Sequence, residues 1–230
     1  MPVLTPAETT AIWLSVKIGL LAVAGTVPLA YGLAYLLSRG RFPGKALLDA
    51  VVHLPLVLPP VVTGFVLLLF FGRGGWGGVL LDRIFGTTLL FRWTGAAVAA
   101  GVMALPLIVG AIRLSLDGID RRLEVAARTL GAGPWRTFAM VTLPLSRPGL
   151  IAGAVLGFAR SVGEFGATIT FVSNIPGETQ TLPIIIHGLL QQPDGESAAL
   201  RLSGIAVALS LAALLASGWL TRRATRGRRT

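Results

Sequence analysis

The chain has 230 residues, of which 53% are hydrophobic and 13% are charged, and its formal net charge is +10. A water-soluble domain carries about 25% charged residues, so this chain has too little polar surface to face water on all sides. The composition indicates an integral membrane protein and excludes collagen, coiled coil and disorder. The sequence has no cysteine and two histidines, which removes disulfides, iron–sulfur clusters and thiolate zinc sites and leaves little for any other metal site.

Five segments are long and apolar enough to cross a bilayer, which takes about 20 residues of helix. We predict an all-α fold, a polytopic transmembrane helix bundle that forms one domain over residues 1–230. The fourth span is interrupted by Arg160 and Glu164, whereas the other four have charge-free centres. The predicted spans cover about residues 11–38, 49–72, 94–116, 143–172 and 202–221.

The second span contains Pro55, Pro59 and Pro60. Each proline removes a backbone donor and frees a carbonyl group one turn earlier. Broken backbone at membrane depth is tolerated where it packs on protein or lines a water-filled cavity. The prolines therefore mark either a wall of a translocation pathway, with a gate, or a kink packed against neighbouring helices. We interpret the nearby His53 as a hydrogen-bonded structural side chain.

Two outer segments are too short to span the membrane. A glycine loop at residues 72–78 carries Trp76 and leads into an amphipathic stretch at residues 79–85, and tryptophan favours the membrane interface. The apolar run at residues 182–190 is also too short to cross, so we predict a short helix or a re-entrant element there.

The inner loop at about residues 120–131 is predicted to form a short helix. Asp120 is a suitable N-cap, and Gly131 is a suitable stop. A helix of this length is not stable alone in water, so it needs a partner protein, or it rests on its own chain or on lipid headgroups. Its apolar side chains recur at helical spacing and form one small face, made of Leu123, Ala126, Ala127 and Leu130.

The fourth span has two notable features. Small residues recur every four positions and form a ridge for another helix, from the same chain or from a second copy; they are Gly149, Gly153 and Gly157. Arg160 and Glu164 are four residues apart, so they meet on one helical face. Charges at mid-membrane cost roughly 2.5–3.5 kcal/mol each and usually pair or face water. The pair is either a local ion pair that fixes packing, or it places Arg160 near the path of an anion.

The basic residues predict the orientation of the spans. Fourteen Lys and Arg residues flank the span ends on one side, and four lie on the other. Basic residues near span ends stay cytoplasmic, so we predict an outer N-terminus and an inner C-terminus. Nucleic-acid binding explains the charge poorly, because the surplus flanks the membrane rather than forming one patch. The inner residues are Arg39, Arg41, Lys45, Arg113, Arg121, Arg122, Arg128, Arg136, Arg147, Arg222, Arg223, Arg226, Arg228 and Arg229, and the outer ones are Arg73, Arg83, Arg92 and Arg201.

The inner loop resembles the cytoplasmic EAA loop of permease subunits in ABC importers. The shared pattern is Ala126 and Ala127, three residues, Gly131, nine residues and then the letters VTLP. Val125 occupies the position where the motif has its acid, and Glu124 lies one residue earlier, a rotation of about 100° on a helix. The resemblance implies that Glu124, Ala126, Ala127 and Gly131 belong to a coupling helix that docks in a groove of an ATPase subunit.

Nearly the whole chain is similar to the molybdate permeases of bacterial ABC importers, a family that also includes sulfate and thiosulfate permeases. The similarity is carried by residues 41–45 (RFPGK), 53–62 (HLPLVLPPVV), 159–170 (ARSVGEFGATIT) and 174–179 (NIPGET). It implies the permease fold of type I ABC importers and transport of molybdate by alternating access, with sulfate, thiosulfate or tungstate as alternative substrates. It also implies a multi-pass protein of the bacterial inner membrane whose partners are a second copy of itself, two cytoplasmic ABC ATPase subunits and a periplasmic oxyanion-binding protein.

Other classes of membrane protein fit the residues less well. An intramembrane enzyme needs a nucleophile with a base, an acid pair or metal ligands, and the spans offer one acid, one histidine and no cysteine. We therefore predict no catalytic and no metal-binding residue. A passive channel or receptor anchor has no use for a coupling helix. The phosphate-binding G-x4-G-K-[S/T] motif does not occur, so we expect no cofactor on this chain, with ATP and Mg²⁺ bound by the partner ATPase.

Overall fold

A computed structural model describes residues 4–226, with side chains as far as Ala216. The regular elements in this range are all helical, which confirms the all-α prediction. They are α1 (Pro6–Arg39), α2 (Lys45–Val57), α3 (Pro60–Phe71), α4 (Trp76–Phe85), α5 (Trp93–Asp117), α6 (Arg121–Thr129), α7 (Pro134–Thr137), the π-helix η1 (Phe138–Thr142), α8 (Leu143–Val162), α9 (Gly166–Val172), α10 (Leu182–Leu189) and α11 (Glu196–Arg226).

α1 begins at a capping box. Thr5 N donates to Glu8 Oε2 (2.8 Å) and Glu8 N donates to Thr5 Oγ1 (3.3 Å), so two backbone donors at the helix start are satisfied. Pro6 occupies the first helical position, where a backbone N–H has no intrahelical partner to lose. These signals start α1 at Pro6 rather than near residue 11.

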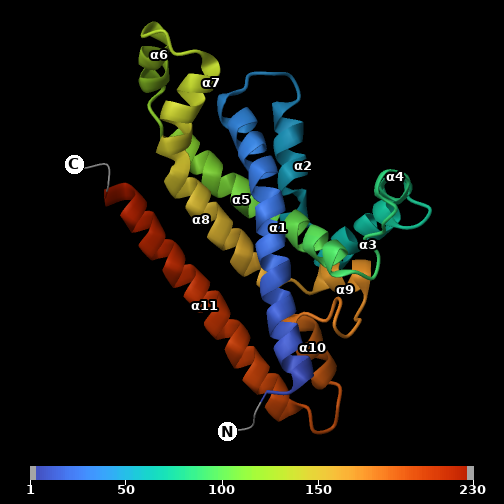
Figure 1. Cartoon of the computed structure of the whole chain (residues 1–230). Coiled ribbons are helices and arrows are strands. Elements are labelled where there is room, and N and C mark those ends of the chain that lie inside the picture. The colour runs from blue at the N-terminus through green and yellow to red at the C-terminus, as the bar shows by residue number, and fades with distance from the viewer. Residues whose placement is uncertain (1–3, 227–230) are drawn as a thin grey trace.

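Figure 1 shows α1 in the middle of the bundle, with α5 and α8 crossing beside it and α11 slanting along the α8 side. α6 and α7 lie at one end of the bundle. α10 lies at the opposite end, beside the first turns of α1 and α11. We call these two ends the α6 end and the α10 end.

The buried apolar side chains form three clusters along α1. At the α10 end, Ala11 packs with Leu182 of α10 and Leu202 of α11. In the middle, Ile18 belongs to a cluster with side chains of α3, α5 and α9. Toward the α6 end, Leu37 belongs to a cluster with side chains of α2 and α5. α1 therefore joins the packing of the bundle from one end to the other.

Four helical stretches among the described residues are long and apolar enough to cross a membrane. They are α1, α5, the continuous stretch Pro134–Val162 and the part of α11 at Glu196–Ala216. α2 and α3 pass the same test only as a pair, bent by 115° at the break between them, and they make a fifth span if the pair is counted as one.

The second span breaks at Leu58 and Pro59, within the run of prolines where the sequence indicates broken or kinked backbone. Both residues are extended, with ψ angles of 142° and 133°. Each of them precedes a proline, and the proline ring disfavours the helical conformation of the residue before it. Two prolines in succession, Pro59 and Pro60, therefore turn the chain into a sharp elbow between α2 and α3.

The predicted fourth span, at about residues 143–172, consists of two helices rather than one. α8 ends at Val162, and α9 is a separate short helix that begins at Gly166. In the other direction, the helical path continues back through η1 and α7 to Pro134, for 29 residues in all. η1 is a turn of π-helix, which is wider than an α-turn and places its hydrogen bonds five residues apart.

The two outer segments form short helices. The glycine loop leads into α4, which ends at Gly86 in the left-handed conformation (φ 59°). The apolar run at residues 182–190 forms α10, and Leu182 N at its start donates to the Ser15 Oγ of α1 (2.7 Å). α10 is thereby fixed to the first half of α1.

Candidate coupling helix and membrane pathway

The ends of α6 lie where the sequence signals place them. The carboxylate of Asp120 accepts a hydrogen bond from Arg122 N (2.9 Å) and caps the helix. Gly131 adopts the left-handed conformation (φ 85°), and Ala132 N donates to Ala127 O (3.0 Å). This is the hydrogen-bond pattern of a Schellman motif, in which glycine is favoured because it has no Cβ. α6 therefore has a defined length and direction.

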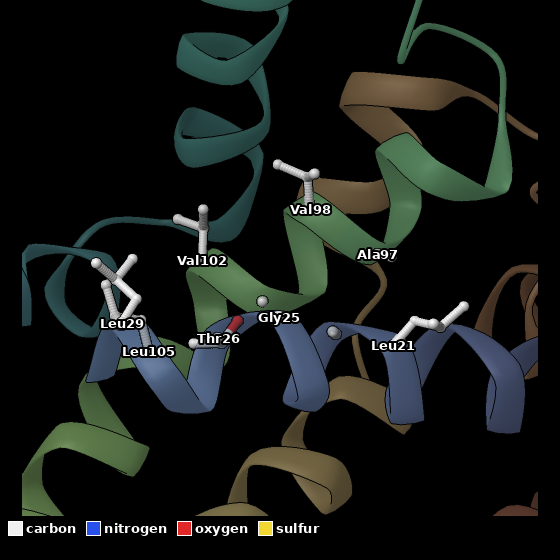
Figure 2. Close-up of a pocket in the computed structure, with 10 residues that line it drawn as sticks. Leu21, Gly25, Thr26, Leu29, Ala97, Val98, Val102 and Leu105 are labelled. Carbon is white, nitrogen blue, oxygen red and sulfur yellow. The ribbon is translucent and has the colours of Figure 1, made fainter. Parts of the chain in front are cut away.

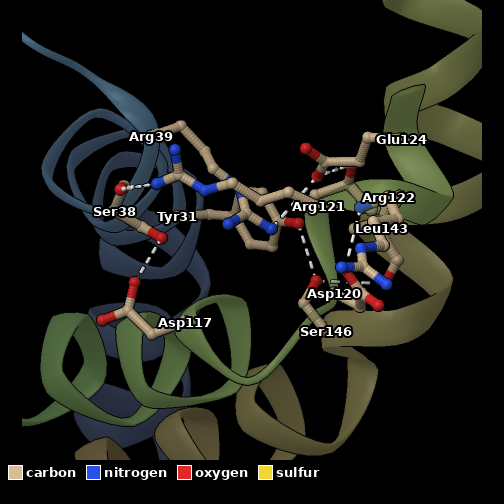
Figure 3. A network of polar contacts seen from close by, with 11 residues as sticks. Tyr31, Ser38, Arg39, Asp117, Asp120, Arg121, Arg122, Glu124, Leu143 and Ser146 are labelled. Carbon is tan, nitrogen blue, oxygen red and sulfur yellow. Dashed lines mark hydrogen bonds and ion pairs between the residues drawn. The ribbon is translucent and has the colours of Figure 1, made fainter. Parts of the chain in front are cut away.

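Polar contacts fix α6 to the end of α1 (Figure 3). Arg39 Nη2 lies 3.2 Å from Glu124 Oε1, and Thr142 Oγ1 of η1 donates to the same oxygen (2.9 Å). The Arg39 and Glu124 side chains are only 11% and 12% exposed. Arg121 Nη2 donates to Ser38 O (3.3 Å). Glu124 therefore contacts its own chain, whereas its predicted part in ATPase docking stays a prediction.

The polar network continues across α2 and α5. Ser38 Oγ of α1 donates to Asp117 Oδ1 at the end of α5 (2.5 Å). Arg113 Nη1 of α5 donates to both carboxylate oxygens of Asp49 on α2, each at 2.9 Å. His53 Nδ1 lies 2.9 Å from Asp49 O, so this histidine is a hydrogen-bonded side chain. Four helices are thus connected by polar contacts at the α6 end.

An aromatic cluster joins η1 to α1. The ring of Phe138 meets the rings of Tyr31 and Tyr35 edge-on, with centroids 5.7 and 5.8 Å apart. The hydroxyl of Tyr31 also shares a hydrogen bond with Ser146 Oγ of α8 (2.7 Å). The rod formed by α7, η1 and α8 is therefore packed on the same half of α1 that contacts α6.

The outward face of α6 has no partner in the described chain. Ala126 is exposed and Ala127 is half-buried. α6 rests on its own chain through its polar side, and most of its apolar side chains are left exposed. Four large apolar side chains of this region are at least half exposed: Leu123 (50%), Val125 (59%), Leu130 (88%) and Trp135 (83%). Val125 lies about 200° around the helix from Leu123, on the side of α6 toward Arg39. We call Leu123, Ala126, Ala127, Leu130 and the neighbouring Trp135 the α6 face.

The three prolines of the second span have different positions. Pro55 lies inside α2 and does not end it, whereas Pro59 and Pro60 form the exposed elbow. α9 packs closely on α3 after the elbow: a Cβ at Gly64 would lie 2.6 Å from a backbone oxygen of α9, and one at Gly166 would lie 2.7 Å from the Cβ of Pro60. The elbow is therefore supported by α9, and its place in a pathway wall stays a prediction.

Arg160 and Glu164 pair, with Arg160 Nη1 2.5 Å from Glu164 Oε2, but they do not share one helix. α8 ends at Val162, so the interpretation of a pair on one helical face is wrong. Glu164 Oε1 accepts from Ala167 N (2.8 Å) and so satisfies a backbone donor in the first turn of α9. The Glu164 side chain is 2% exposed and that of Arg160 is 26% exposed. The carboxylate thus connects the end of α8 to the start of α9.

The glycine ridge of α8 faces α5 of the same chain. A Cβ at Gly149 would lie 2.3 Å from Ser115 Cβ, one at Gly153 would lie 3.1 Å from Ile108 O, and one at Gly157 would lie 2.6 Å from Ile108 Cδ1. At Gly149 the Cβ would be in steric conflict with atoms that cannot easily move away, whereas at Gly153 and Gly157 a small shift of the backbone or of the Ile108 side chain would be needed. The close approach of α5 and α8 therefore depends most strongly on Gly149. The sequence left open which helix lies on this ridge, and the structure shows α5.

Figure 2 shows an open groove of about 310 Å³ between α1 and α5. Its walls are apolar side chains such as Leu21, Leu29 and Val102, and Thr26 supplies the one polar side chain among the lining residues. The groove offers no charged group to an anion. Charged side chains of the described residues lie instead at the α6 end, around Glu164, and at the α10 end, where Arg201 pairs with the buried Glu8.

Among the described side chains, no group of three or more His, Asp or Glu residues could hold a metal ion. The sequence was also compared with models of known protein families. The model for the inner membrane component of binding-protein-dependent transport systems matches residues 26–226.

The chain belongs to this family. The matched segment includes the elbow, α6 and the rod that ends at Val162. Membership in this family, together with the four apolar helical stretches, identifies a multi-pass membrane protein. Its relatives are permease components of transporters, which are not catalytic themselves.

Several curated members of the family are similar over nearly the full chain. The molybdenum transport system permease protein ModB of Escherichia coli (strain K12) is 58% identical over 220 residues, which cover 96% of each chain. The ModB protein of Haemophilus influenzae is 53% identical over 94% of each chain. The sulfate transport system permease protein CysW of Synechococcus elongatus is 38% identical over 89% of this chain and 73% of its own.

Solved structures show the same fold at low sequence identity. A bacterial ABC transporter that imports alginate matches with a TM-score of 0.75 and 18% identity, over 96% of this chain and 80% of that one. The MetNI methionine ABC transporter, in inward-facing conformations, matches with a TM-score of 0.71 and 19% identity, over 93% and 94% of the two chains. This family member therefore has the fold of ABC importer permeases.

Sequence reasoning missed two residues of the α6 region. Arg39 was counted only as a basic flank of the first span, yet it is the partner of Glu124. Trp135 follows Pro134 and carries no periodic signal, yet it is one of the most exposed large apolar side chains. A tryptophan in a loop predicted to lie outside the membrane is the one sequence signal that pointed to it, because such a side chain is costly to leave in water.

Proposed function

We propose that this chain is the membrane-spanning permease subunit of an ATP-driven ABC importer for molybdate. The observation that supports this best is the 58% identity to a molybdenum permease over 96% of both chains. The sulfate permease of Synechococcus elongatus shares only 38% of its residues over a smaller part of its length. Sulfate, thiosulfate and tungstate remain the alternative substrates within the same family.

In this proposal, two copies of the chain form the translocation pathway in the bacterial cytoplasmic membrane. Each copy is one domain with five spans, the bent pair α2 and α3 counting as one, with the N-terminus outside and the C-terminus inside. One ATPase subunit docks on the α6 face of each copy, two ATPase subunits in all, and these bind ATP and Mg²⁺, while this chain carries no cofactor. A periplasmic oxyanion-binding protein delivers the anion at the α10 end. The exposed apolar residues of the α6 face support the docking.

Transport then requires that nucleotide binding favours one orientation of the spans, and by reciprocity that the orientation alters nucleotide affinity. Glu124 contacts both α1 and η1, so a displacement of α6 acts on the central helix and on the rod together. Arg160 is proposed to lie beside the anion path. Its charge is balanced by Glu164, and a weakened anion site suits passage better than storage.

Uptake of radioactive molybdate tests the proposed substrate. The chain is expressed with its own ATPase and binding protein in cells that lack their molybdate permease. We expect uptake that excess tungstate reduces and that excess sulfate leaves unchanged. Uptake of sulfate with equal efficiency would assign the chain to the sulfate branch instead.

Cysteine labelling tests the orientation in this cysteine-free chain. Single cysteines replace the exposed residues Ala7 at the α10 end and Thr129 on α6, and Thr225 near the end of α11. A membrane-impermeant maleimide added to intact cells should label the first and spare the other two. Labelling of Ala7→Cys and Thr225→Cys from the same side would contradict the five-span topology.

A further inference from the structure

A basic pocket lies between the end of α1 and α6. Its volume is about 240 Å³, and its lining is Tyr35, Arg39, Arg121, Glu124, Val125 and Arg128. Three arginines and one glutamate leave a formal charge of +2 (3 − 1) in this small space. Figure 3 shows Arg39, Arg121 and Glu124 close together at this end of the bundle.

The arginines of the pocket have more hydrogen-bond donors than the described chain has acceptors for them. A guanidinium group carries five N–H donors. Arg39 gives one to Glu124 and Arg121 gives one to Ser38 O, while the guanidinium group of Arg128 has no hydrogen-bond or ion-pair partner among the described residues. Arg39 Nε is buried without an acceptor, on a side chain that is only 11% exposed. A buried donor without a partner destabilises the fold, and a bound acceptor would remove that penalty.

We propose that this pocket binds a tetrahedral oxyanion, with phosphate as its model ligand. The planar guanidinium group matches two oxygens of such an anion at once, and charge-assisted bonds of this kind are about twice as strong as neutral ones. Tyr35 lines the same pocket and supplies a hydroxyl group. The net charge of +2 favours a doubly charged anion over a neutral ligand.

Two sources can present this chemistry at the α6 end. One is a free oxyanion in water, and the other is the phosphate of an anionic lipid headgroup beside α1. In either case the anion would bridge Arg39 of α1 and Arg128 of α6, and would fix α6 against the bundle. The site consists of residues of this chain alone, so its two binding assays need no ATPase, and its failure would leave the transport proposal unaffected.

The free-anion arm uses the full chain in a detergent whose headgroup is uncharged. Its melting temperature is measured with inorganic phosphate and with chloride at equal ionic strength, since a ligand that binds only the folded state stabilises it. Phosphate should raise the melting temperature of the wild type. Arg128→Gln, which breaks no side-chain hydrogen bond or ion pair among the described residues, should weaken the apparent phosphate affinity about tenfold, the loss of one charge-assisted bond. Arg122→Gln is the matched control, because Arg122 lies on the same exposed helix and does not line the pocket.

The lipid arm uses the same three proteins in nanodiscs, with native mass spectrometry to count retained lipids. If the source is a headgroup, phosphatidylglycerol should be retained by the wild type and by Arg122→Gln and lost from Arg128→Gln, and phosphatidylcholine should not be retained by any of them. Either a phosphate effect or a phosphatidylglycerol effect that depends on Arg128 supports the site and identifies its source.

Equal behaviour of Arg128→Gln and Arg122→Gln in both arms would overturn the proposal. The same is true if both anions are without effect and only Arg128→Gln loses co-purification of the ATPase. In that case a carboxylate of the partner protein fills the pocket, and no small anion binds there.

Discussion

The contact between Arg39 and Glu124 makes a quantitative prediction about how α6 is fixed to the bundle. At 3.2 Å, and with an effective dielectric constant near 20, the gross Coulomb attraction is about 5 kcal/mol. Desolvation of both groups offsets much of this value. Removing one partner of a fully buried pair costs about 3–5 kcal/mol, and an exposed pair contributes about 1 kcal/mol or less. With side chains 11% and 12% exposed, we expect Glu124→Gln to lower the free energy of unfolding by about 2–3 kcal/mol.

The reverse substitution, Arg39→Gln, should cost less. In Arg39→Gln, the carboxylate of Glu124 keeps its hydrogen bond from Thr142 Oγ1. In Glu124→Gln, the Arg39 guanidinium group loses its carboxylate partner, and its Nε is already without an acceptor. The double variant should be more stable than the sum of the single effects predicts, with a coupling energy of about 1–2 kcal/mol. In thermal unfolding of the full chain in detergent, Glu124→Gln should lower the melting temperature by about 4–12 °C.

Arg122→Gln serves as the control, because Arg122 is exposed on the same helix and should change stability by less than about 0.5 kcal/mol. Two results would refute the reasoning. One is strict additivity of the two single variants, and the other is a larger loss for Arg39→Gln than for Glu124→Gln.

Three further predictions concern packing, the charged pair and docking. Gly149→Ala should destabilise the chain by about 1–3 kcal/mol in thermal unfolding, because its Cβ would lie 2.3 Å from the Ser115 side chain. Gly110→Ala is the control and should be neutral or stabilising, because there is open space around Gly110. Equal effects of the two substitutions would contradict the close packing of α5 and α8. Glu164→Ala should destabilise the chain more than Glu164→Gln, because glutamine still offers a side-chain oxygen to Ala167 N. The reversed order in the same assay would show that the Glu164 side chain does not cap α9. Ala126→Trp, at an exposed position, should leave the melting temperature unchanged and abolish co-purification of the ATPase and ATP-driven uptake; wild-type uptake would show that α6 does not dock as proposed.

Much of the fold could be predicted from local signals. The composition and the apolar segments indicate helices in a membrane, and Asp120 and Gly131 mark both ends of α6 through backbone hydrogen bonds made within a few residues. The break at Leu58 and Pro59 follows from the effect of proline on the preceding residue, although the sequence does not give the angle of 115°. That angle depends on how α3 packs against α9.

The remaining features depend on residues that are distant along the chain. Arg39 and Glu124 are 85 positions apart, and nothing in helical periodicity connects them. The spacing of Arg160 and Glu164 correctly indicates an ion pair but incorrectly indicates a continuous helix, because a buried carboxylate can satisfy the first turn of a new helix equally well. The glycine ridge predicts a close helix contact, yet only tertiary structure identifies the partner as α5.

The uninterrupted rod from Pro134 to Val162 has a mechanical consequence. Its 29 residues are about 43 Å long, and its two ends carry different structures: the α6 region adjoins one, and the Glu164 junction with α9 adjoins the other. A rod of this length acts as a lever, so a tilt of about 5° about one end displaces the other by about 4 Å. The glycine contacts with α5 begin near the middle of the rod, at Gly149, and they are the place at which we expect the rod to pivot. A small displacement of α6 would then move the Arg160 region by a larger or a smaller distance, depending on which part of the glycine ridge the rod pivots about.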